Sequence, residues 1–373
     1  MSPFPPMRRV ATLALFGLAL GHLVAPAQAM SLSVETIGVG TVTDISADGR
    51  AAVGQLPTTL TTFRWTRETG IVSLGRGTYR PLRGQTAGIP RISADGKTVA
   101  ATIIDDTKTF YTQGLWTEGS GWRQLNQPLP PDGGVVDNGD SAVFGLSRDG
   151  RVVTGLYWRP GQPDGLAHGS LWREATGMTG LSTRGASSRV DDANEDGSVV
   201  VGWEENPVDG SRQPAVWVQG ERTVLGMMGE AASVNAAGTL IVGQNYDEAT
   251  ATSTAAVWRR TSEGWQLQSL GVLPGTRPGG YAYATAASDD GRLVVGFNRR
   301  NFLNPKTQTF LWMPETGMVE TTAFLKSQGI DLGDQVSIDF LPAVTPRGDA
   351  VVAVTTDKAA PYTRRSLLIK LRR

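Results

Sequence analysis

The chain has 373 residues, with 35 Lys and Arg against 35 Asp and Glu, 46 Gly, 21 Pro and no Cys. The balanced charge argues against nucleic acid or an anionic membrane surface as an obligate partner. The lack of Cys excludes thiol catalysis, disulfides and Cys-ligated zinc. A hydrophobic content of 40% is enough for a substantial core, and the many Gly and Pro residues predict numerous turns.

Residues 1–29 have the pattern of a secretory signal peptide. Arg8 and Arg9 precede an apolar run at 10–24, and an Ala-Gln-Ala signal-peptidase site follows. The run is short for a membrane span, and an uncleaved anchor is the alternative. We therefore expect an exported protein, periplasmic or extracellular. Its mature part, residues 30–373, is expected to be a single domain without a membrane span.

One ten-residue element recurs along the mature chain. The first copy is Ile45 to Gly54 (ISADGRAAVG), and the later copies begin at Ile92, Leu146, Ala193, Val234, Ala287 and Val344. Five copies carry Asp-Gly between two short apolar segments, at Asp48, Asp95, Asp149, Asp196 and Asp290. Asp-Gly in this setting is a strong hairpin signal, because Gly adopts the positive φ of the turn without strain.

Each copy is followed by a short apolar segment that ends in Trp, at Trp65, Trp116, Trp172, Trp217, Trp258 and Trp312. Leu368 takes this position after the last copy, and a second turn such as Glu68-Thr69-Gly70 leads into a fourth segment. Seven four-stranded units of about 50 residues predict an all-β, seven-bladed β-propeller. We expect the tryptophans to pack between neighbouring blades, and an aromatic sugar-binding platform is the alternative.

The two ends of the mature chain predict how such a ring closes. Ser33 to Gly38 matches a fourth strand with no first three before it, and Leu367 to Leu371 matches a third strand with no fourth after it. We expect the N-terminal strand to pair with the C-terminal strands and complete one blade, which removes an exposed sheet edge. Deletion of residues 30–38 is expected to open the ring.

Five segments carry a resemblance to a known family: Ile45 to Gly49, Ile92 to Gly96, Leu270 to Gly275 (LGVLPG), Gln308 to Met318 (QTFLWMPETGM) and Phe324 to Asp334 (FLKSQGIDLGD). They resemble the HAF-type extracellular repeat family, and the resemblance extends over residues 33–373. It implies a bacterial, exported, propeller-like repeat protein. It implies no activity for particular residues.

Few residues in this pattern can support catalysis. Outside the signal peptide the single His is His168, at a repeat position just before Trp172, so neither a Ser-His-Asp triad nor a multi-His metal site is indicated. Asp44 and Asp191 lie near the start of an innermost strand, where a carboxylate either faces the central channel or is a solvated strand end. The acidic loop 132–140 could hold Ca²⁺, but its spacing departs from the EF-hand. We expect no metal and no cofactor.

The variable connections define the candidate binding surface. Strand alternation places the connections between second and third strands, and those between units, on one face of the disc; the long ones are 76–89, 126–142, 157–167, 271–282 and 322–338. Variable loops on a rigid scaffold are where binding usually occurs, with Arg and aromatic side chains as anchors. The candidate binding residues are Arg80, Arg83, Trp158, Arg159, Arg277, Tyr281, Tyr283, Arg299 and Arg300. Solvated loops without a ligand are the alternative.

These patterns favour a binding or scaffold module whose partner is an unidentified protein or glycan of the cell envelope. One alternative is a carbohydrate-active or lactone-cleaving enzyme that uses channel carboxylates. Another is a cell-surface structural protein that self-associates. Converging carboxylates with shifted pKa values would favour the enzyme, a broad Arg and aromatic surface would favour binding, and an exposed apolar surface elsewhere would favour assembly.

Overall fold

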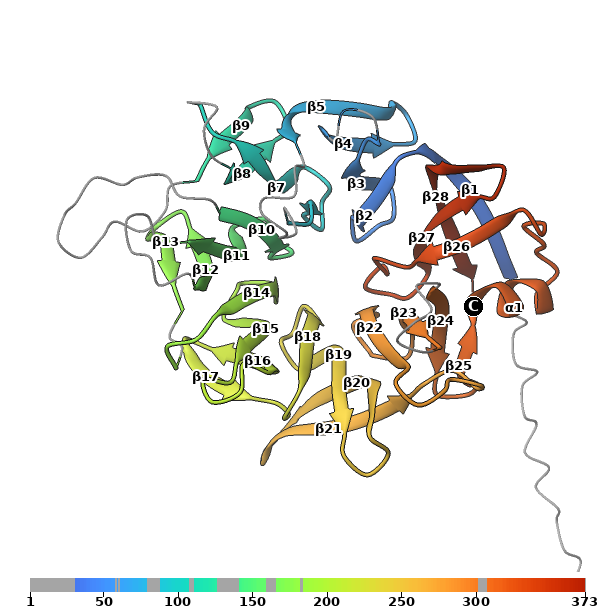
Figure 1. Ribbon diagram of the computed structural model, residues 1–373. Coiled ribbons are helices and arrows are strands. Elements are labelled where there is room, and N and C mark those ends of the chain that lie inside the picture. The colour runs from blue at the N-terminus through green and yellow to red at the C-terminus, as the bar shows by residue number, and fades with distance from the viewer. Residues whose placement is uncertain are drawn as a thin grey trace, which may run out of the picture.

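The computed structural model describes residues 31–57, 59, 61–78, 88–106, 111–125, 141–158, 166–181, 184–300 and 307–372. The expected signal peptide, residues 1–29, lies outside these ranges. Within them the regular structure is β, apart from one short helix. Figure 1 shows the sheets arranged around a common centre.

Antiparallel strands form sets of four in chain order. The first sheet contains β2 (Thr41–Ile45), β3 (Ala51–Gln55), β4 (Thr61–Thr66) and β5 (Gly70–Thr78). The second contains β6 (Arg91–Ile92), β7 (Thr98–Ile104), β8 (Tyr111–Thr117) and β9 (Gly121–Gln124). The third contains β10 (Ser141–Leu146), β11 (Val152–Trp158), β12 (Ala167–Arg173) and β13 (Gly177–Gly180). The next sheet contains β14 (Ser188–Ala193), β15 (Val199–Glu205), β16 (Arg212–Val218) and β17 (Glu221–Val224).

The following eight strands form one sheet: β18 (Gly229–Val234), β19 (Leu240–Asp247), β20 (Thr252–Thr261), β21 (Gly264–Gly271), β22 (Tyr281–Ala287), β23 (Val294–Arg299), β24 (Thr307–Met313) and β25 (Gly317–Glu320). A single parallel pair, Ser253 with Tyr281, joins its two sets of four. The last sheet contains β26 (Val336–Phe340), β27 (Ala350–Asp357), β28 (Ala360–Arg372) and β1 (Ser31–Val39).

The antiparallel order gives each sheet two distinct ends. The first strand of each set begins at what we call the loop end, where the connections between second and third strands also lie. It finishes at the turn end, where the Asp-Gly turns lie. Figure 1 shows β2, β10, β14, β18 and β22 nearest the centre.

Four of the turns between first and second strands have a Ser-x-Asp-Gly pattern, which begins at Ser46, Ser93, Ser147 and Ser288. The Ser46 hydroxyl donates to Asp48 (2.8 Å) and accepts from the amide of Ala51 (2.9 Å), and Asp48 accepts from the amide of Arg50 (3.0 Å). Gly49 has a φ of +68°, a conformation that costs a side-chain-bearing residue energy. The hydroxyl and the carboxylate thus satisfy amides that the tight turn leaves without a backbone partner.

A bulge in the first strand explains the Gly that ends the recurring element. In β14 the register with β15 shifts between Val190 and Asp192, which leaves Asp191 as the extra residue. A Cβ atom on Gly202, in the facing part of β15, would lie 2.0 Å from the carbonyl oxygen of Arg189. The backbones approach so closely that only Gly fits there.

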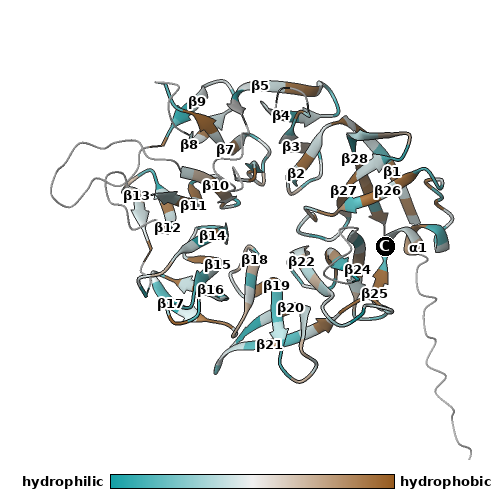
Figure 2. Cartoon of the chain, viewed as in Figure 1, coloured by the Kyte–Doolittle hydropathy of each residue, from teal (hydrophilic) through white to brown (hydrophobic). Residues whose placement is uncertain are grey.

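The recurring tryptophans lie in apolar clusters shared by neighbouring sheets. Trp65 on β4 packs with Val352 and Leu368 of the last sheet, and Trp258 on β20 packs with Val216 of the preceding sheet. Trp217 is fully buried. Figure 2 shows the hydrophobic segments mainly on the strands, with hydrophilic colour frequent on the connecting turns. The core is therefore distributed between sheets, around the centre.

The N-terminal strand β1 pairs with β28, from Ser31 opposite Arg372 to Val39 opposite Arg365, with one bulge. The Glu35 carboxylate of β1 binds Arg67 in the β4–β5 turn (2.9 Å) and Lys370 on β28 (2.5 Å). A first-sheet residue and a last-sheet residue thus hold the same carboxylate.

The connection 322–338, expected as a long loop, contains a helix. Helix α1 (Thr321–Ser327) begins after Glu320, whose side chain caps it by accepting from the amides of Thr322 and Ala323. Phe324 and Leu325 are buried in the core of the last two sets of strands. The capping carboxylate and this adjacent apolar pair stabilise a short helix that the strand repeat did not predict.

Candidate functional site

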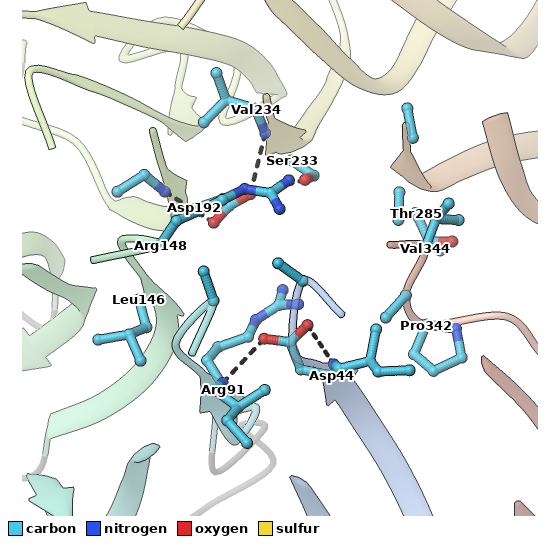
Figure 3. A pocket seen from close by; sticks show the side chains of 18 residues that line it. Asp44, Arg91, Leu146, Arg148, Asp192, Ser233, Val234, Thr285, Pro342 and Val344 are labelled. Atoms are coloured by element: carbon cyan, nitrogen blue, oxygen red, sulfur yellow. Dashed lines mark hydrogen bonds between the residues drawn. The ribbon is translucent and has the colours of Figure 1, made fainter. Parts of the chain in front are cut away.

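The first strands enclose a small polar cavity of about 60 Å³ at the centre of the molecule. Figure 3 shows Asp44, Arg91, Arg148 and Asp192 around it, opposite the apolar side chains of Pro342 and Val344. Two carboxylates and two guanidinium groups therefore share a space that fits a few water molecules. The cavity is far below the usual size of a pocket for an organic ligand.

Asp44 lines this cavity and is held by backbone amides. Its two carboxylate oxygens accept from Ile45 (2.8 Å) and from Ile92 of the next sheet (3.0 Å). Burial raises the pKa of Asp44, while the positive charge of Arg91 opposes the rise. The carboxylate joins two neighbouring first strands, which is a structural role.

Asp191 does not line the cavity, whereas Asp192 does. The bulge makes Asp192 the counterpart of Asp44: its oxygens accept from the amides of Ala193 (2.9 Å) and Val234 (3.0 Å) and from the Ser233 hydroxyl (2.7 Å). The sequence contained this signal, because Asp192 precedes Ala193 as Asp44 precedes Ile45. Asp191 has a different set of partners.

Asp191 belongs to a charged cluster near the loop end, formed with Arg189 on the same strand, Glu230 on β18 and Tyr283 on β22. Arg189 donates to Asp191 (2.6 Å) and to Glu230 (3.3 Å), and the Tyr283 hydroxyl donates to Glu230 (3.2 Å). The Arg189 guanidinium also lies over the ring of Phe144, 4.4 Å from its centroid. Side chains of consecutive first strands thus converge on one arginine.

The position of Asp191 raises its pKa to about 6. Burial is the main cause, the nearby charge of Glu230 adds to it, and Arg189 acts in the opposite direction. The second oxygen of Asp191, Oδ2, is buried and has no hydrogen-bond partner within the described residues. Burial also raises the pKa of Tyr283 well above its ordinary value. Sequence reasoning missed Arg189 and Glu230, since nothing in the repeat distinguishes them from solvated strand ends.

An ion pair crosses the centre at the turn end. Arg148, in the β10–β11 turn, lies 3.1 Å from Asp289, in the β22–β23 turn. Two complete sets of strands, β14–β17 and β18–β21, separate these turns along the chain. The Arg148–Asp289 pair at the turn end and the Arg189 cluster near the loop end thus each occupy part of the central space.

Three predicted binding residues come together at the loop end of β22 and β23. Arg299 is the strand partner of Tyr281 and lies over its ring, 5.6 Å from the centroid. Tyr283 stacks on Phe297, with centroids 5.4 Å apart and planes 14° apart. Because Tyr283 also binds Glu230, this aromatic surface is continuous with the Arg189 cluster.

The other predicted residues have different positions. The backbone amide of Arg277 donates to the carbonyl of Arg300 (2.9 Å), which places both beside Arg299. Trp158 is half-buried and packs against Phe144 and Leu156, so it contributes to the core. Arg80, Arg83, Arg159 and the acidic loop 132–140 lie outside the described residues.

Metal ligation has little support in the part of the chain described. No three His, Asp or Glu side chains there come together as a metal site would require. His168, on β12, is buried with its ring 5.4 Å from that of Tyr157. Also within these ranges, no helix is long and apolar enough to cross a membrane.

Comparison with known proteins shows likeness of fold. No protein-family model and no curated protein sequence matches the chain. The β-propeller domain of the Trilobed protease from Pyrococcus furiosus, described as having an open velcro topology, matches with a TM-score of 0.53 and 12% identity over 89% of this chain and 95% of that one. The β-propeller domain of Cps50 (Swd1) from Myceliophteria thermophila gives 0.52 and 10%, over 90% and 98%.

The acylaminoacyl peptidase of Pyrococcus horikoshii matches with a TM-score of 0.53 and 11% identity, over 89% of this chain and 51% of the peptidase. At these identities the likeness shows the fold alone. The chain is an all-β protein whose four-stranded sheets resemble those of β-propellers.

Proposed function

We propose that the chain is an exported, seven-bladed β-propeller that acts as a binding module through its loop-end surface, with a protein or glycan of the cell envelope as partner. The count of seven treats β18–β21 and β22–β25 as separate blades, since one residue pair joins them. Export rests on the pattern of residues 1–29, and the relation to HAF-type repeats rests on the five quoted segments.

Contacts between the first and last sheets support closure of the ring. Besides β1 with β28, the Ser366 hydroxyl of β28 donates to the carbonyl of Gly40 (2.9 Å) and accepts from the amide of Val42 on β2 (2.9 Å). These bonds link the last sheet to the first. Deletion of residues 30–38 would remove most of β1, and a melting temperature equal to that of the intact mature chain would contradict closure.

Backbone bonds between turns support the same conclusion. At the turn end the backbone amide of Ala47 donates to the carbonyl of Ala94 (2.9 Å), and the amide of Ala94 donates to the carbonyl of Arg148 (2.8 Å). Asp289 donates in the same way to Pro346 (2.8 Å). Each bond joins a turn to the corresponding turn of the next set, as expected for blades in a ring.

The observation that carries the binding role is the surface of Tyr281, Tyr283 and Arg299. Arg and Tyr are among the residue types most often found to anchor interfaces, and here they lie beside a central space whose charged side chains bind one another and leave a cavity of only about 60 Å³. A partner would therefore bind at the end of the channel and not inside it.

A pull-down from cell-envelope extract tests this role. The mature chain would be compared with a Tyr281→Ala/Arg299→Ala variant and with a control, Arg151→Ala/Arg347→Ala, which changes exposed arginines at the turn end. We expect the first variant to lose a partner that the wild type and the control both retain. Equal capture by all three proteins would show that the loop-end surface is not the binding site.

A hydrolase is the second candidate, and Asp191 is the observation that favours it. A carboxyl group with a pKa near 6 beside a second carboxylate, Glu230, is a common acid–base arrangement in glycoside hydrolysis. Chromogenic aryl glycosides and a γ-lactone would be the probes. Hydrolysis that changes through pH 6 and is lost in Asp191→Asn would support the enzyme, and no turnover of any probe would exclude these substrates.

A further inference from the structure

The loop-end corner where the β21–β22 connection meets the end of β23 contains three arginines, Arg277, Arg299 and Arg300. The backbone bond between Arg277 and Arg300 holds the two segments side by side. A second bond, from the amide of Gly280 to the carbonyl of Arg277 (2.9 Å), makes the connection a defined turn. The backbones of the three arginines therefore lie close together.

None of these arginines has an acidic partner among the described residues. Arg300 donates to the amide oxygen of Gln308 (2.8 Å), and Arg299 contacts the ring of Tyr281. Several other exposed arginines bind carboxylates, as Arg123 binds Glu174 and Arg212 binds Glu230. This corner is thus a local excess of positive charge in a chain of zero formal net charge.

Arg299 gives independent evidence that an acceptor is missing. Its Nε atom is buried and donates to no described group, whereas buried donors are nearly always satisfied. The strand pairing with Tyr281 fixes where this guanidinium lies. Arg277 and Arg300 are exposed, so a ligand can reach both side chains.

We propose that this arginine corner binds an oxyanion, a carboxylate, sulfate or phosphate group, carried by the ligand of the loop-end surface. The planar guanidinium fork matches the geometry of such groups and binds them in a bidentate manner. Tyr281 beside Arg299 offers an apolar face to the part of the ligand that bears the anion. The inference rests on the proposed binding role and specifies the chemistry of the partner.

Binding of charged and neutral dextrans to the full mature chain tests the proposal. Dextran sulfate, neutral dextran and inorganic sulfate would be the probes, measured by calorimetry at two salt concentrations. We expect dextran sulfate to bind and neutral dextran not to bind, with weaker binding at higher salt. Competition by inorganic sulfate alone would show that the free ion is sufficient, whereas its failure to compete would show that the polymer contributes.

Two triple variants with equal change of charge complete the test. Arg277→Gln/Arg299→Gln/Arg300→Gln should weaken dextran sulfate binding at least tenfold. The control, Lys97→Gln/Arg151→Gln/Arg347→Gln at the turn end, should weaken it less than threefold. The single variants replace the triple if circular dichroism shows that it does not fold. Equal loss in both sets, or no preference for the sulfated polymer, would overturn the proposal.

Failure of this inference is distinguishable from failure of the binding role. If the Tyr281→Ala/Arg299→Ala variant loses its envelope partner while dextran sulfate and dextran bind alike, the surface binds a ligand that is not anionic. If capture is unchanged as well, the surface is not a binding site.

Discussion

The Glu35 carboxylate is the clearest electrostatic contact between the two ends of the chain. It binds Arg67 of the first sheet and Lys370 of the last sheet, and these two partners lower its pKa from 4.5 to about 2, with Arg67 as the largest cause. Glu35→Gln keeps the shape of the side chain and removes its charge. We expect this change to weaken the attachment of β1 and therefore the whole ring.

The magnitude follows from the pKa shift. Each pKa unit corresponds to about 1.4 kcal/mol, so the shift from 4.5 to about 2 sets an upper limit of roughly 3.5 kcal/mol. The Glu35 side chain is 28% exposed, and solvent screening reduces the expected loss to about 1–2 kcal/mol. Because the folded-state pKa lies below the unfolded value, this stability is present above pH 4.5 and is lost as the pH falls towards 2.

Urea unfolding at several pH values between 3 and 7 measures the effect. Wild type should exceed Glu35→Gln in unfolding free energy at pH 7, and the difference should shrink below pH 4.5. Glu118→Gln, which removes a half-exposed carboxylate 3.4 Å from Arg64, is the matched control and should change little. A difference that is absent at pH 7, or that stays constant down to pH 3, would refute the role assigned to Glu35.

Four further changes test other parts of the structure by the same unfolding measurement. Gly202→Ala should cost about 2–4 kcal/mol, because the new Cβ would lie 2.0 Å from the carbonyl of Arg189. Trp217→Ala should cost about 3–5 kcal/mol, since the indole is fully buried. Gln219→Asn should stabilise by about 0.5–1 kcal/mol, because residue 219 has a φ of +51°, which Asn adopts more readily. Asp191→Asn should remove a stability loss that develops between pH 4 and 6, because the folded-state pKa is raised to about 6 and the charged form is penalised above it.

The sequence predicts the repeating sheets well because the relevant chemistry is local. Ser46, Asp48 and Gly49 build their turn with contacts no more than five residues apart. The same pattern returns at Ser93, Ser147 and Ser288, and in the other sets Asn194, Asn235 or Thr345 accepts the equivalent hydrogen bond in place of Ser. The four-stranded architecture therefore follows from hydrogen bonding that each copy satisfies by itself. The helix α1 departs from the pattern. It could not be predicted from the repeat because its two buried side chains, Phe324 and Leu325, are stabilised by packing against the neighbouring sheets.

The candidate site was harder to predict because a bulge reverses the strand alternation. Asp191 and Asp192 are equally acidic and adjacent, and a regular strand would place one of them in the channel without indicating which. The extra residue at 191 places Asp192 at the cavity and Asp191 against Arg189. Tyr281 and Arg299 could be assigned to the loop end from the sequence because that assignment needs no knowledge of the register; their role in binding stays a prediction.

The charged contacts in the central space support the proposed binding role over the proposed hydrolase. A substrate near Asp191 would have to displace the contacts of Arg189 with Asp191 and Glu230, whose side chains are 16%, 7% and 17% exposed. That displacement leaves buried charges without partners, which costs several kcal/mol before any favourable contact forms. The Arg148–Asp289 pair at the turn end is more exposed, at 23% and 36%, so its loss costs less. The surface of Tyr281 and Arg299 demands no such loss, since its arginines have no acidic partner in the described structure. These costs are the physical reason for proposing binding at the end of the central space.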